Sequence, residues 1–143
     1  MKIKNNRALA GIDIVIAVMA ITIFSTLIVS MMHSNVMENA KLKKETEAMI
    51  YITEIFENIG IENYNNLPVG NYEDITNNSY DESIEKLIPT DIEGKYLVNL
   101  VITDQLEGVS DKEDILKKVQ ITLTYDLVGK RYNCSMERMK IKE

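Results

Sequence analysis

The 143-residue sequence contains only one cysteine, Cys134, and only one histidine, His33. A single cysteine excludes a disulfide within the chain, and with one histidine most metal sites and nucleophilic catalytic arrangements are unavailable. Phosphate-binding Gly-Lys-Ser/Thr runs, paired cysteines, His-Glu-x-x-His and Gly-x-Ser-x-Gly are also missing. We therefore predict no catalytic residue, no cofactor and no metal, and we expect a protein that is not an enzyme.

Outside the first eight positions, acidic residues outnumber basic residues. Met1 to Ala8 holds three of the 16 basic residues and none of the 22 acidic ones, which leaves a formal charge of −9 from Leu9 onward. Nucleic-acid binding needs a basic surface, and so does attachment to anionic lipid headgroups. We therefore expect no direct nucleic-acid contact.

A long apolar segment from Leu9 to Met32 follows the basic start of the chain, and Asp13 is its only charged residue. Twenty-four helical residues measure roughly 36 Å, which is enough to cross a hydrocarbon core of about 30 Å. A removable signal peptide has a shorter apolar region and ends in a small-residue cleavage site, which Met31-Met32-His33 lacks. We therefore predict a membrane-spanning helix.

The charges on either side of this segment predict its orientation. Lys2, Lys4 and Arg7 precede it, whereas the other flank carries Glu38 before its first lysine at Lys41. Because basic flanks stay in the cytoplasm, we expect a single span of the cytoplasmic membrane with the N-terminus inside and the C-terminal domain outside.

Asp13 lies where an ionised carboxylate costs about 2.5 to 3.5 kcal/mol, and such residues usually face a partner. If the chain were cut between Ala8 and Leu9, the new amine of Leu9 would lie one helical turn from Asp13. It could also pair with the Asp13 of a neighbouring copy.

This arrangement resembles the N-terminus of type IV pilins and pseudopilins, in which a short basic leader precedes an apolar helix with an acid at its fifth position. Ala8 matches the last leader residue, Leu9 the first mature residue and Asp13 the acidic fifth. Ala8 and Asp13 differ from the commoner Gly and Glu. Aligning Gly11 as the last leader residue would put Ile16 at the acidic position, so Ala8 fits better.

The resemblance implies a structural subunit of a type IV pilus, type II secretion or DNA-uptake filament, most similar to a minor pilin or minor pseudopilin. It implies that a prepilin peptidase cleaves between Ala8 and Leu9 and methylates the new amine. Asp13 would then pair with the N-terminus of another pilin subunit during assembly. An assembly platform and an ATPase would be the further partners.

An alternative from another class remains open. The chain would then be an uncleaved, single-span membrane protein whose outer domain binds a ligand or a partner protein. This alternative predicts that the leader persists and that Asp13 is dispensable.

The apolar pattern changes after the predicted membrane exit near His33. Ala48, Ile52, Ile55, Phe56 and Ile59 recur at three- and four-residue spacing, with glutamates on the other face. We expect an amphipathic helix over residues 33–59, with Gly60 just past its end. His33 has no companion ligand and is expected at the membrane interface.

Residues 60–94 read as a connecting region rich in Asn, Pro and Gly. A loop of this length usually contains unrecognised structure or is functional. We expect a helical turn over Ser83 to Leu87. Tyr64, Tyr72 and Tyr80 either anchor the region on a sheet or form a subunit contact, and we favour anchoring.

Strands are predicted over residues 95–143, beginning with Lys95 to Thr103. Val119 to Tyr125 alternates apolar and polar residues, and a short turn over Asp126 to Lys130 leads into a second alternating run containing Cys134. A lone Cys134 in a strand is expected to be a buried small hydrophobe. The apolar phase then shifts to Met139 and Ile141, which suggests a bulge near Glu137 and Arg138, or fraying.

Asp104 to Lys118 is predicted to connect these strands. Ser110 to Glu113 fits a capping box before a short helical turn over Asp111 to Leu116. The fold expected for the chain is α+β and pilin-like: leader 1–8, membrane helix 9–32, and an outer domain 33–143 with three or four antiparallel strands. The inner face of the sheet, Val119 to Tyr125, is expected to pack on Ile52, Ile55, Phe56 and Ile59.

Overall fold

The computed structural model describes residues 3–104 and 116–142, with side chains described from Gly11 onward. The chain divides into two compact units, Met1–Leu42 and Lys43–Glu143. Helix α1 (Ile3–Ile61) contributes to both units. The sequence placed the membrane exit near His33, and His33 is an exposed helical residue of the first unit.

Helix α1 is longer than predicted at both ends. It begins at Ile3, within the predicted leader, because nothing in Ile3 to Arg7 breaks a helix. It ends at Ile61 rather than Ile59, so Gly60 lies inside the helix, and the Glu62 amide still donates to the Asn58 carbonyl at 3.2 Å. The prediction that Gly60 ends the helix was wrong.

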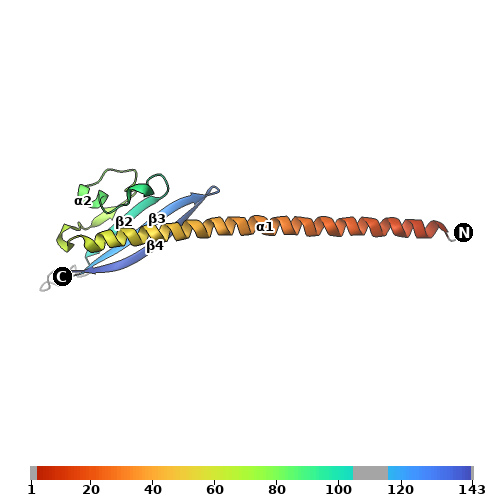
Figure 1. Ribbon diagram of the computed structural model, residues 1–143, viewed down its shortest axis with the longest axis horizontal. Helices are drawn as coiled ribbons and strands as arrows, with labels where there is room; N and C mark the ends of the chain where they lie inside the picture. The colour runs from red at the N-terminus through yellow and green to blue at the C-terminus, as the bar shows by residue number, and fades with distance from the viewer. Residues whose placement is uncertain (1–2, 105–115, 143) are drawn as a thin grey trace. The chain divides into compact units, whose positions relative to one another are not determined.

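The second unit contains a four-stranded antiparallel sheet in the order β1-β2-β3-β4. Its strands are β1 (Gly70–Tyr72), β2 (Leu97–Asp104), β3 (Leu116–Leu127) and β4 (Lys130–Ile141). The C-terminal part of α1 lies across one face of this sheet (Figure 1). The coarse α+β prediction is therefore confirmed.

The core of the second unit lies between α1 and the sheet, where the sequence pattern placed it. Val119, Ile121, Leu123 and Tyr125 of β3 are buried, and Ile52, Ile55, Phe56 and Ile59 of α1 belong to the same apolar cluster. Strand β2 adds Val98, Leu100 and Ile102 to it. The alternation of period two in the strands and the three- and four-residue spacing in the helix therefore describe two faces of one core.

The predicted connecting region holds several short elements. These are a 3₁₀ turn η1 (Tyr64–Asn66), strand β1, helix α2 (Glu82–Glu85) and a second 3₁₀ turn η2 (Thr90–Ile92). Ile84, Leu87 and Ile92 of this region belong to the core, and the Asn58 side chain of α1 donates to the Leu87 carbonyl at 3.0 Å. The region thus packs beside α1.

The three tyrosines of this region do anchor it. Tyr64 is buried, and Tyr72 and Tyr80 meet edge to face with their ring centroids 5.5 Å apart. The hydroxyl of Tyr80 donates to the Glu73 carbonyl at 2.8 Å, and that of Tyr72 donates to the Pro68 carbonyl at 3.2 Å. These contacts tie the segment to itself and to the core.

The predicted bulge in β4 is absent, because β3 and β4 pair without interruption from Leu127↔Lys130 to Leu116↔Ile141. The shift of the apolar phase has another cause. Arg138 and Lys140 follow Tyr132, Cys134 and Met136 on the face toward α1, so the inner face changes from apolar to basic. Met139 and Ile141 lie on the opposite face, where 52% and 65% of each is exposed.

The bounds of two strands differ from the prediction. Strand β2 begins at Leu97 rather than Lys95 and ends one residue later than predicted, and β3 is longer at both ends. Asp104 belongs to β2, and Leu116, Lys117 and Lys118 belong to β3, so the predicted connection is shorter at both ends. The predicted capping box, Ser110 to Glu113, and most of the helical turn after it lie outside the described residues.

Candidate functional site: the apolar helical segment

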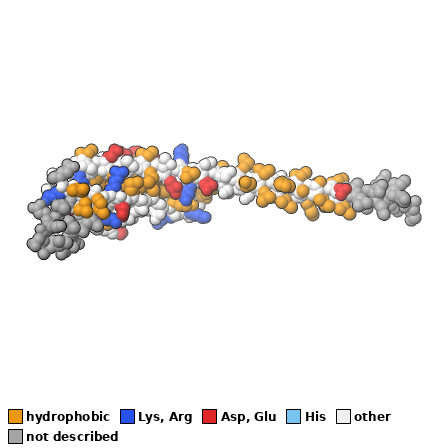
Figure 2. Space-filling view, turned by 90° about the horizontal axis from the view of Figure 1, so that it is seen from below, with side chains coloured by type: hydrophobic (Ala, Val, Ile, Leu, Met, Phe, Trp, Pro, Cys, Tyr) orange, Lys and Arg blue, Asp and Glu red, His pale blue; other side chains and the backbone are white. Residues whose placement is uncertain are grey.

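The part of α1 from Gly11 to Met32 exposes every one of its side chains. The exposed fraction of its large apolar side chains ranges from 54% for Val15 to 67% for Phe24 and Met31. Figure 2 shows hydrophobic side chains along this segment, whereas charged side chains of both signs cover much of the second unit. The segment thus has no apolar core within its own unit.

The hydroxyl groups of the two threonines in this segment hydrogen-bond to the helix backbone. Thr22 donates to the Val18 carbonyl at 2.7 Å, and Thr26 lies 2.8 Å from the Thr22 carbonyl and 2.9 Å from that of Ile23. A hydroxyl that bonds its own helix needs no water. These threonines are therefore compatible with an apolar surrounding.

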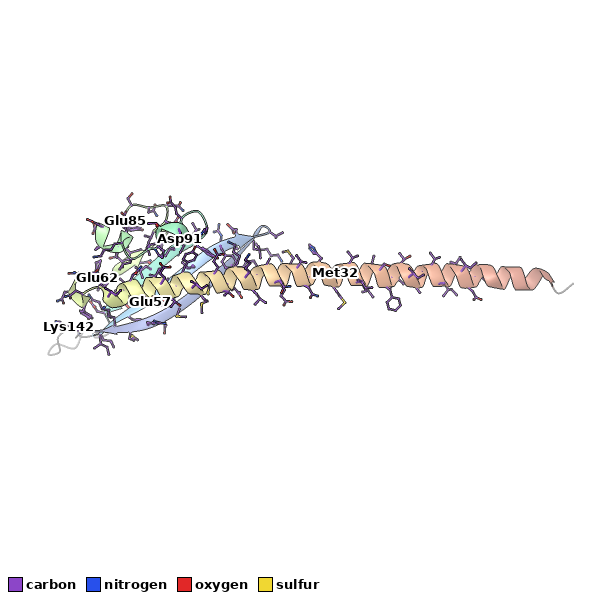
Figure 3. The ribbon with its side chains drawn as sticks, in the orientation of Figure 1. Met32, Glu57, Glu62, Glu85, Asp91 and Lys142 are labelled. Atoms are coloured by element: carbon purple, nitrogen blue, oxygen red, sulfur yellow. The ribbon has the colours of Figure 1, made fainter. Side chains whose placement is uncertain are left out.

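Length and composition allow this helix to cross a membrane, and it is the one such helix among the described residues. The Met32 side chain projects away from the helix (Figure 3) and is 64% exposed. An isolated helix in water could not keep so many large apolar groups exposed without a cost of roughly 25 cal/mol per Å². Transfer of this segment to an apolar environment would therefore be favourable.

Asp13 is the exception in this apolar surface. Its side chain is exposed and makes no hydrogen bond or ion pair with any described residue. Ala8 and Leu9 also lie within α1, and Leu9 is four residues before Asp13, which is one helical turn. The helix thus brings the three predicted site residues onto adjacent turns, while the side chains of Ala8 and Leu9 lie outside the description.

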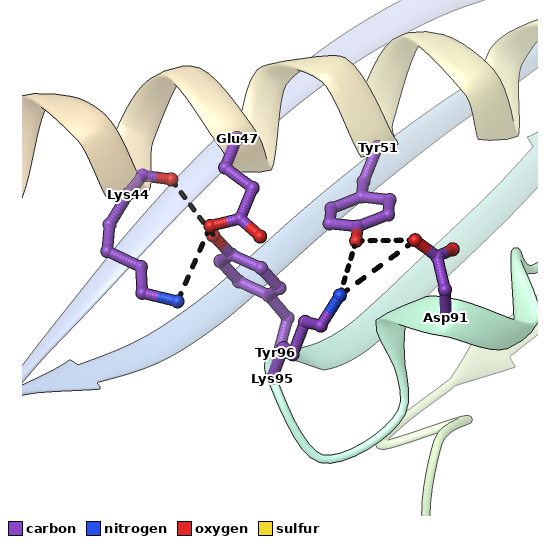
Figure 4. Close-up of polar contacts among 6 residues, drawn as sticks. All are labelled: Lys44, Glu47, Tyr51, Asp91, Lys95 and Tyr96. Atoms are coloured by element: carbon purple, nitrogen blue, oxygen red, sulfur yellow. Dashed lines mark hydrogen bonds and ion pairs between the residues drawn. The ribbon is translucent and has the colours of Figure 1, made fainter.

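A polar network fixes the start of β2 on α1 in the second unit (Figure 4). The Tyr96 hydroxyl lies 3.1 Å from both the Lys44 carbonyl and Glu47 Oε2, and Lys44 Nζ lies 3.4 Å from the same carboxylate oxygen. Burial and, next, the hydrogen bond to Glu47 raise the pKa of Tyr96 well above its usual range. This tyrosine is a structural donor.

A second group of contacts lies one helical turn further along α1 (Figure 4). Tyr51 donates to Asp91 Oδ2 at 2.8 Å, and Lys95 Nζ donates to the Tyr51 hydroxyl at 3.0 Å. The hydrogen bond to Tyr51 is the main cause that raises the pKa of Lys95. Together with Tyr96, these contacts fix the chain before β2 against the helix.

Two lysines on the inner face of the sheet satisfy backbone carbonyls at the end of α1. Lys140 Nζ donates to the carbonyls of Ile59, Gly60 and Glu62 at 2.8, 2.9 and 2.6 Å. Lys117, its partner across the β3–β4 ladder, is buried and donates to the Tyr64 and Leu67 carbonyls at 3.0 and 2.6 Å. The helix end is therefore capped by the sheet.

These lysines were not among the residues that the sequence singled out. The signal that could have found them is strand phase, since Lys117 precedes Val119 by two residues and Lys140 follows Met136 by four. Both positions face inward. A lysine at an inward position indicates a backbone acceptor nearby, because a buried ammonium requires hydrogen-bond partners.

Cys134 was predicted to be a buried small hydrophobe and is half-buried against the core. Its sulfur lies 3.2 Å from Met49 Sδ of α1. Burial, with a smaller effect of the Glu45 charge, raises the pKa of this thiol. A thiol that ionises less readily is a poor nucleophile, so Cys134 contributes to packing between α1 and β4.

A groove of about 680 Å³ lies where α1 ends beside β4. Its walls come from the end of α1, from the residues that follow it and from the end of β4. On one side of the groove the Arg138 guanidinium lies over the Phe56 ring, with Cζ 4.9 Å from the ring centroid. The lining residues include Phe56, Ile59, Glu62, Asn65, Arg138, Met139 and Lys142.

Among the described residues, no group of three or more His, Cys, Asp or Glu side chains could hold a metal ion. No family model, curated protein or solved structure matches this chain.

Proposed function

We propose that this chain is a type IV pilin-like structural subunit, most similar in size and plan to a minor pilin or minor pseudopilin. The observation that carries the proposal is Asp13, the single acid of a helix segment whose apolar side chains are all exposed, and one that has no partner among the described residues. Such a surface is built to be covered by lipid and then by other helices. An acid within it needs a cation that this segment does not contain.

Cleavage between Ala8 and Leu9 would create that cation. An ionised carboxylate within a membrane span costs about 2.5 to 3.5 kcal/mol, and pairing with an amine recovers part of this. The amine of Leu9 in a neighbouring copy is the partner that we propose for Asp13. Assembly would then be favoured because it neutralises a charge that is costly in lipid.

The second unit supports the same proposal. A helix that carries an apolar segment at one end and packs an antiparallel sheet at the other resembles the pilin plan. By the positive-inside rule, Lys2, Lys4 and Arg7 would keep the N-terminus in the cytoplasm and leave the sheet domain outside. A prepilin peptidase, an assembly platform and an assembly ATPase would process the subunit and insert it into a pilus, a secretion pseudopilus or a DNA-uptake filament.

The N-terminus of the protein tests this proposal directly. The full chain would be produced in cells that contain a prepilin peptidase, and its N-terminal peptide and intact mass would be measured. We expect a chain that starts at methylated Leu9. A catalytically inactive peptidase is the matched control and should leave the Met1 leader in place. A leader that persists beside an active peptidase contradicts the proposal.

A second candidate function rests on the groove at the end of α1. An uncleaved, membrane-anchored protein could use this groove of about 680 Å³, with Arg138 and Lys142 at its edge, to bind a ligand or a partner. It requires an intact leader and a dispensable Asp13. The same N-terminal measurement therefore separates the two candidates.

A further inference from the structure

The exposed side of α1 within the second unit carries a narrow stripe of side chains that no other described element covers. We define this outer stripe as Lys43, Thr46, Ile50, Thr53, Glu54 and Glu57. Their spacing of three, four and seven residues places them on one face of the helix, opposite the buried Ile52 and Ile55. The stripe therefore runs along about four turns of α1.

The centre of the outer stripe is apolar and shallowly hollowed. A groove there is lined by Thr46, Met49, Ile50, Thr53, Glu54 and Glu57. Ile50 is 62% exposed, and the Thr53 hydroxyl donates to the Met49 carbonyl at 2.9 Å, so this hydroxyl is already satisfied by the helix. A partner helix could lie here without leaving the Thr53 hydroxyl unpaired.

The two ends of the outer stripe carry opposite charges. Lys43 is at one end, and Glu54 and Glu57 are at the other, where Figure 3 marks Glu57 on α1. None of the three makes a hydrogen bond or ion pair with another described residue. Elsewhere in this unit some surface charges are paired, as Lys86 is with Glu62 and Lys118 is with Glu137, each at 2.7 Å.

We propose that the outer stripe binds a second copy of this chain in parallel orientation, shifted along the helix by 11 to 14 residues. This shift, about 16 to 21 Å at the helical rise, places Lys43 of one copy opposite Glu54 and Glu57 of the other. With this shift, residues 36–39 of the first copy lie opposite Ile50 of the second copy and cover it. The inference rests on the proposed function, because copies anchored in one membrane face the same way.

The charge pattern distinguishes this arrangement from two others. A parallel pair without a shift would place Lys43 against Lys43 and Glu57 against Glu57, and like charges in contact disfavour association. An antiparallel pair would also bring Lys43 to Glu57, but it would place Ile50 against Ile50. In the shifted contact Lys43 of one copy meets Glu54 and Glu57 of the next, and a series of copies repeats this pairing without bringing like charges together.

Cysteine cross-linking of the full chain in membranes tests the proposal. In a Cys134→Ala background, we expect the Lys43→Cys, Glu57→Cys double variant to form disulfide-linked dimers and longer ladders on mild oxidation. Lys43→Cys with Glu82→Cys, which places the second cysteine on exposed α2, is the matched control and should give little product. The cross-linked fraction should differ by about fivefold or more.

Single variants decide between the arrangements. Both alternatives place Ile50 against Ile50, so dimers of Ile50→Cys without dimers of Lys43→Cys would indicate antiparallel packing. Dimers of Lys43→Cys would indicate parallel packing without a shift. Either result overturns the proposal. Absence of the double-variant product overturns it as well. N-terminal mass measured on the same sample reports processing separately, so a processed chain without the cross-link contradicts the shifted contact and leaves the proposed function intact.

Charge reversal gives an independent measurement. Glu54→Lys with Glu57→Lys should lower the fraction of chain in assemblies by roughly tenfold, because like charges then meet across the contact. Adding Lys43→Glu should restore it to within about threefold of the unchanged chain. The control, Glu82→Lys with Glu93→Lys, changes the net charge equally on another surface and should have no effect. Equal losses in both variants would overturn the proposal.

Discussion

Helix α1 has two parts of similar apolar character that differ in what covers them. Ile16 and Ile23 are 59% and 60% exposed in the first unit, whereas Ile52 and Ile55 are fully buried in the second. Isoleucine has the same affinity for an apolar environment in both parts. What differs is the environment: the sheet covers one part, whereas the side chains of the other part are exposed from Gly11 to Met32.

The charges of the two parts differ in the same way. Glu62, at the end of α1, has Lys86 at 2.7 Å and Asn66 at 2.9 Å within its own unit. Asp13 has no such partner among the described residues. Asp13 therefore lies within an apolar surface without the local partners that Glu62 has, and the proposed contact with another copy would remove this difference.

The largest expected effect concerns Asp13. Asp13→Ala should lower incorporation into assemblies by at least about tenfold, because the contact between the acid and a neighbour's amine is lost, while membrane insertion stays unchanged or improves. Membrane fractionation and quantification of assembled subunit measure the two effects. Asp13→Glu keeps the charge and should retain most incorporation. Normal incorporation of the alanine variant would show that Asp13 needs no partner in another molecule, and this would contradict the proposed pairing.

The next effect concerns the buried part of the helix. Ile52→Ala should destabilise the second unit by about 2 to 5 kcal/mol, because it leaves a cavity between α1 and the sheet. Ile28→Ala removes the same atoms from the exposed segment and should leave this stability unchanged. Urea unfolding of the full chain in detergent, followed by the tyrosine signal, measures both. Equal effects would show that the two parts are not independent.

Lys117 tests whether the sheet holds the 3₁₀ turn η1 that follows the helix. Lys117→Met keeps the apolar stem and removes the ammonium, which leaves the Tyr64 and Leu67 carbonyls without this donor. We expect a loss of about 1 to 3 kcal/mol in the free energy of unfolding. Lys118→Met, on the outer face with a surface ion pair to Glu137, should cost less than about 1 kcal/mol. The same urea titration compares the two variants.

Much of the domain could be predicted from the sequence, because strand and helix periods depend on local residues. Val119 to Tyr125 and the buried positions of α1 were confirmed for that reason. The bulge and the end of the helix were wrong because both depend on Lys140, which reaches the helix end from 80 residues away in sequence. Strand β1 was missed because it has three residues and no alternation. Asp13, Ala8 and Leu9 were identified by position alone, and their roles stay a prediction.

The turn between β3 and β4 offers a smaller, stabilising effect. Val128 and Gly129 both have positive φ, 50° and 73°, which is the geometry of a two-residue hairpin turn. A β-branched residue is strained there, and Val128 is 73% exposed, so it gains little from packing. Val128→Asn should therefore stabilise the second unit by about 0.5 to 1 kcal/mol, and Val128→Ile should not. Thermal unfolding of the full chain would detect the difference.

The smallest effect concerns Glu62, the acid that the second unit satisfies locally. Hydrogen bonds from Lys86 and then Asn66 are the main causes that lower its pKa from the ordinary value of 4.5. A carboxylate whose pKa is lower in the folded state stabilises the fold above that ordinary value, and this contribution is lost as the pH falls through the folded pKa. Glu62→Gln should therefore reduce the loss of stability on acidification, while Glu93→Gln, on an exposed position, should not. Urea midpoints measured from neutral pH down to about pH 3 would test this, and identical slopes for all three proteins would show that Glu62 is not held by its neighbours.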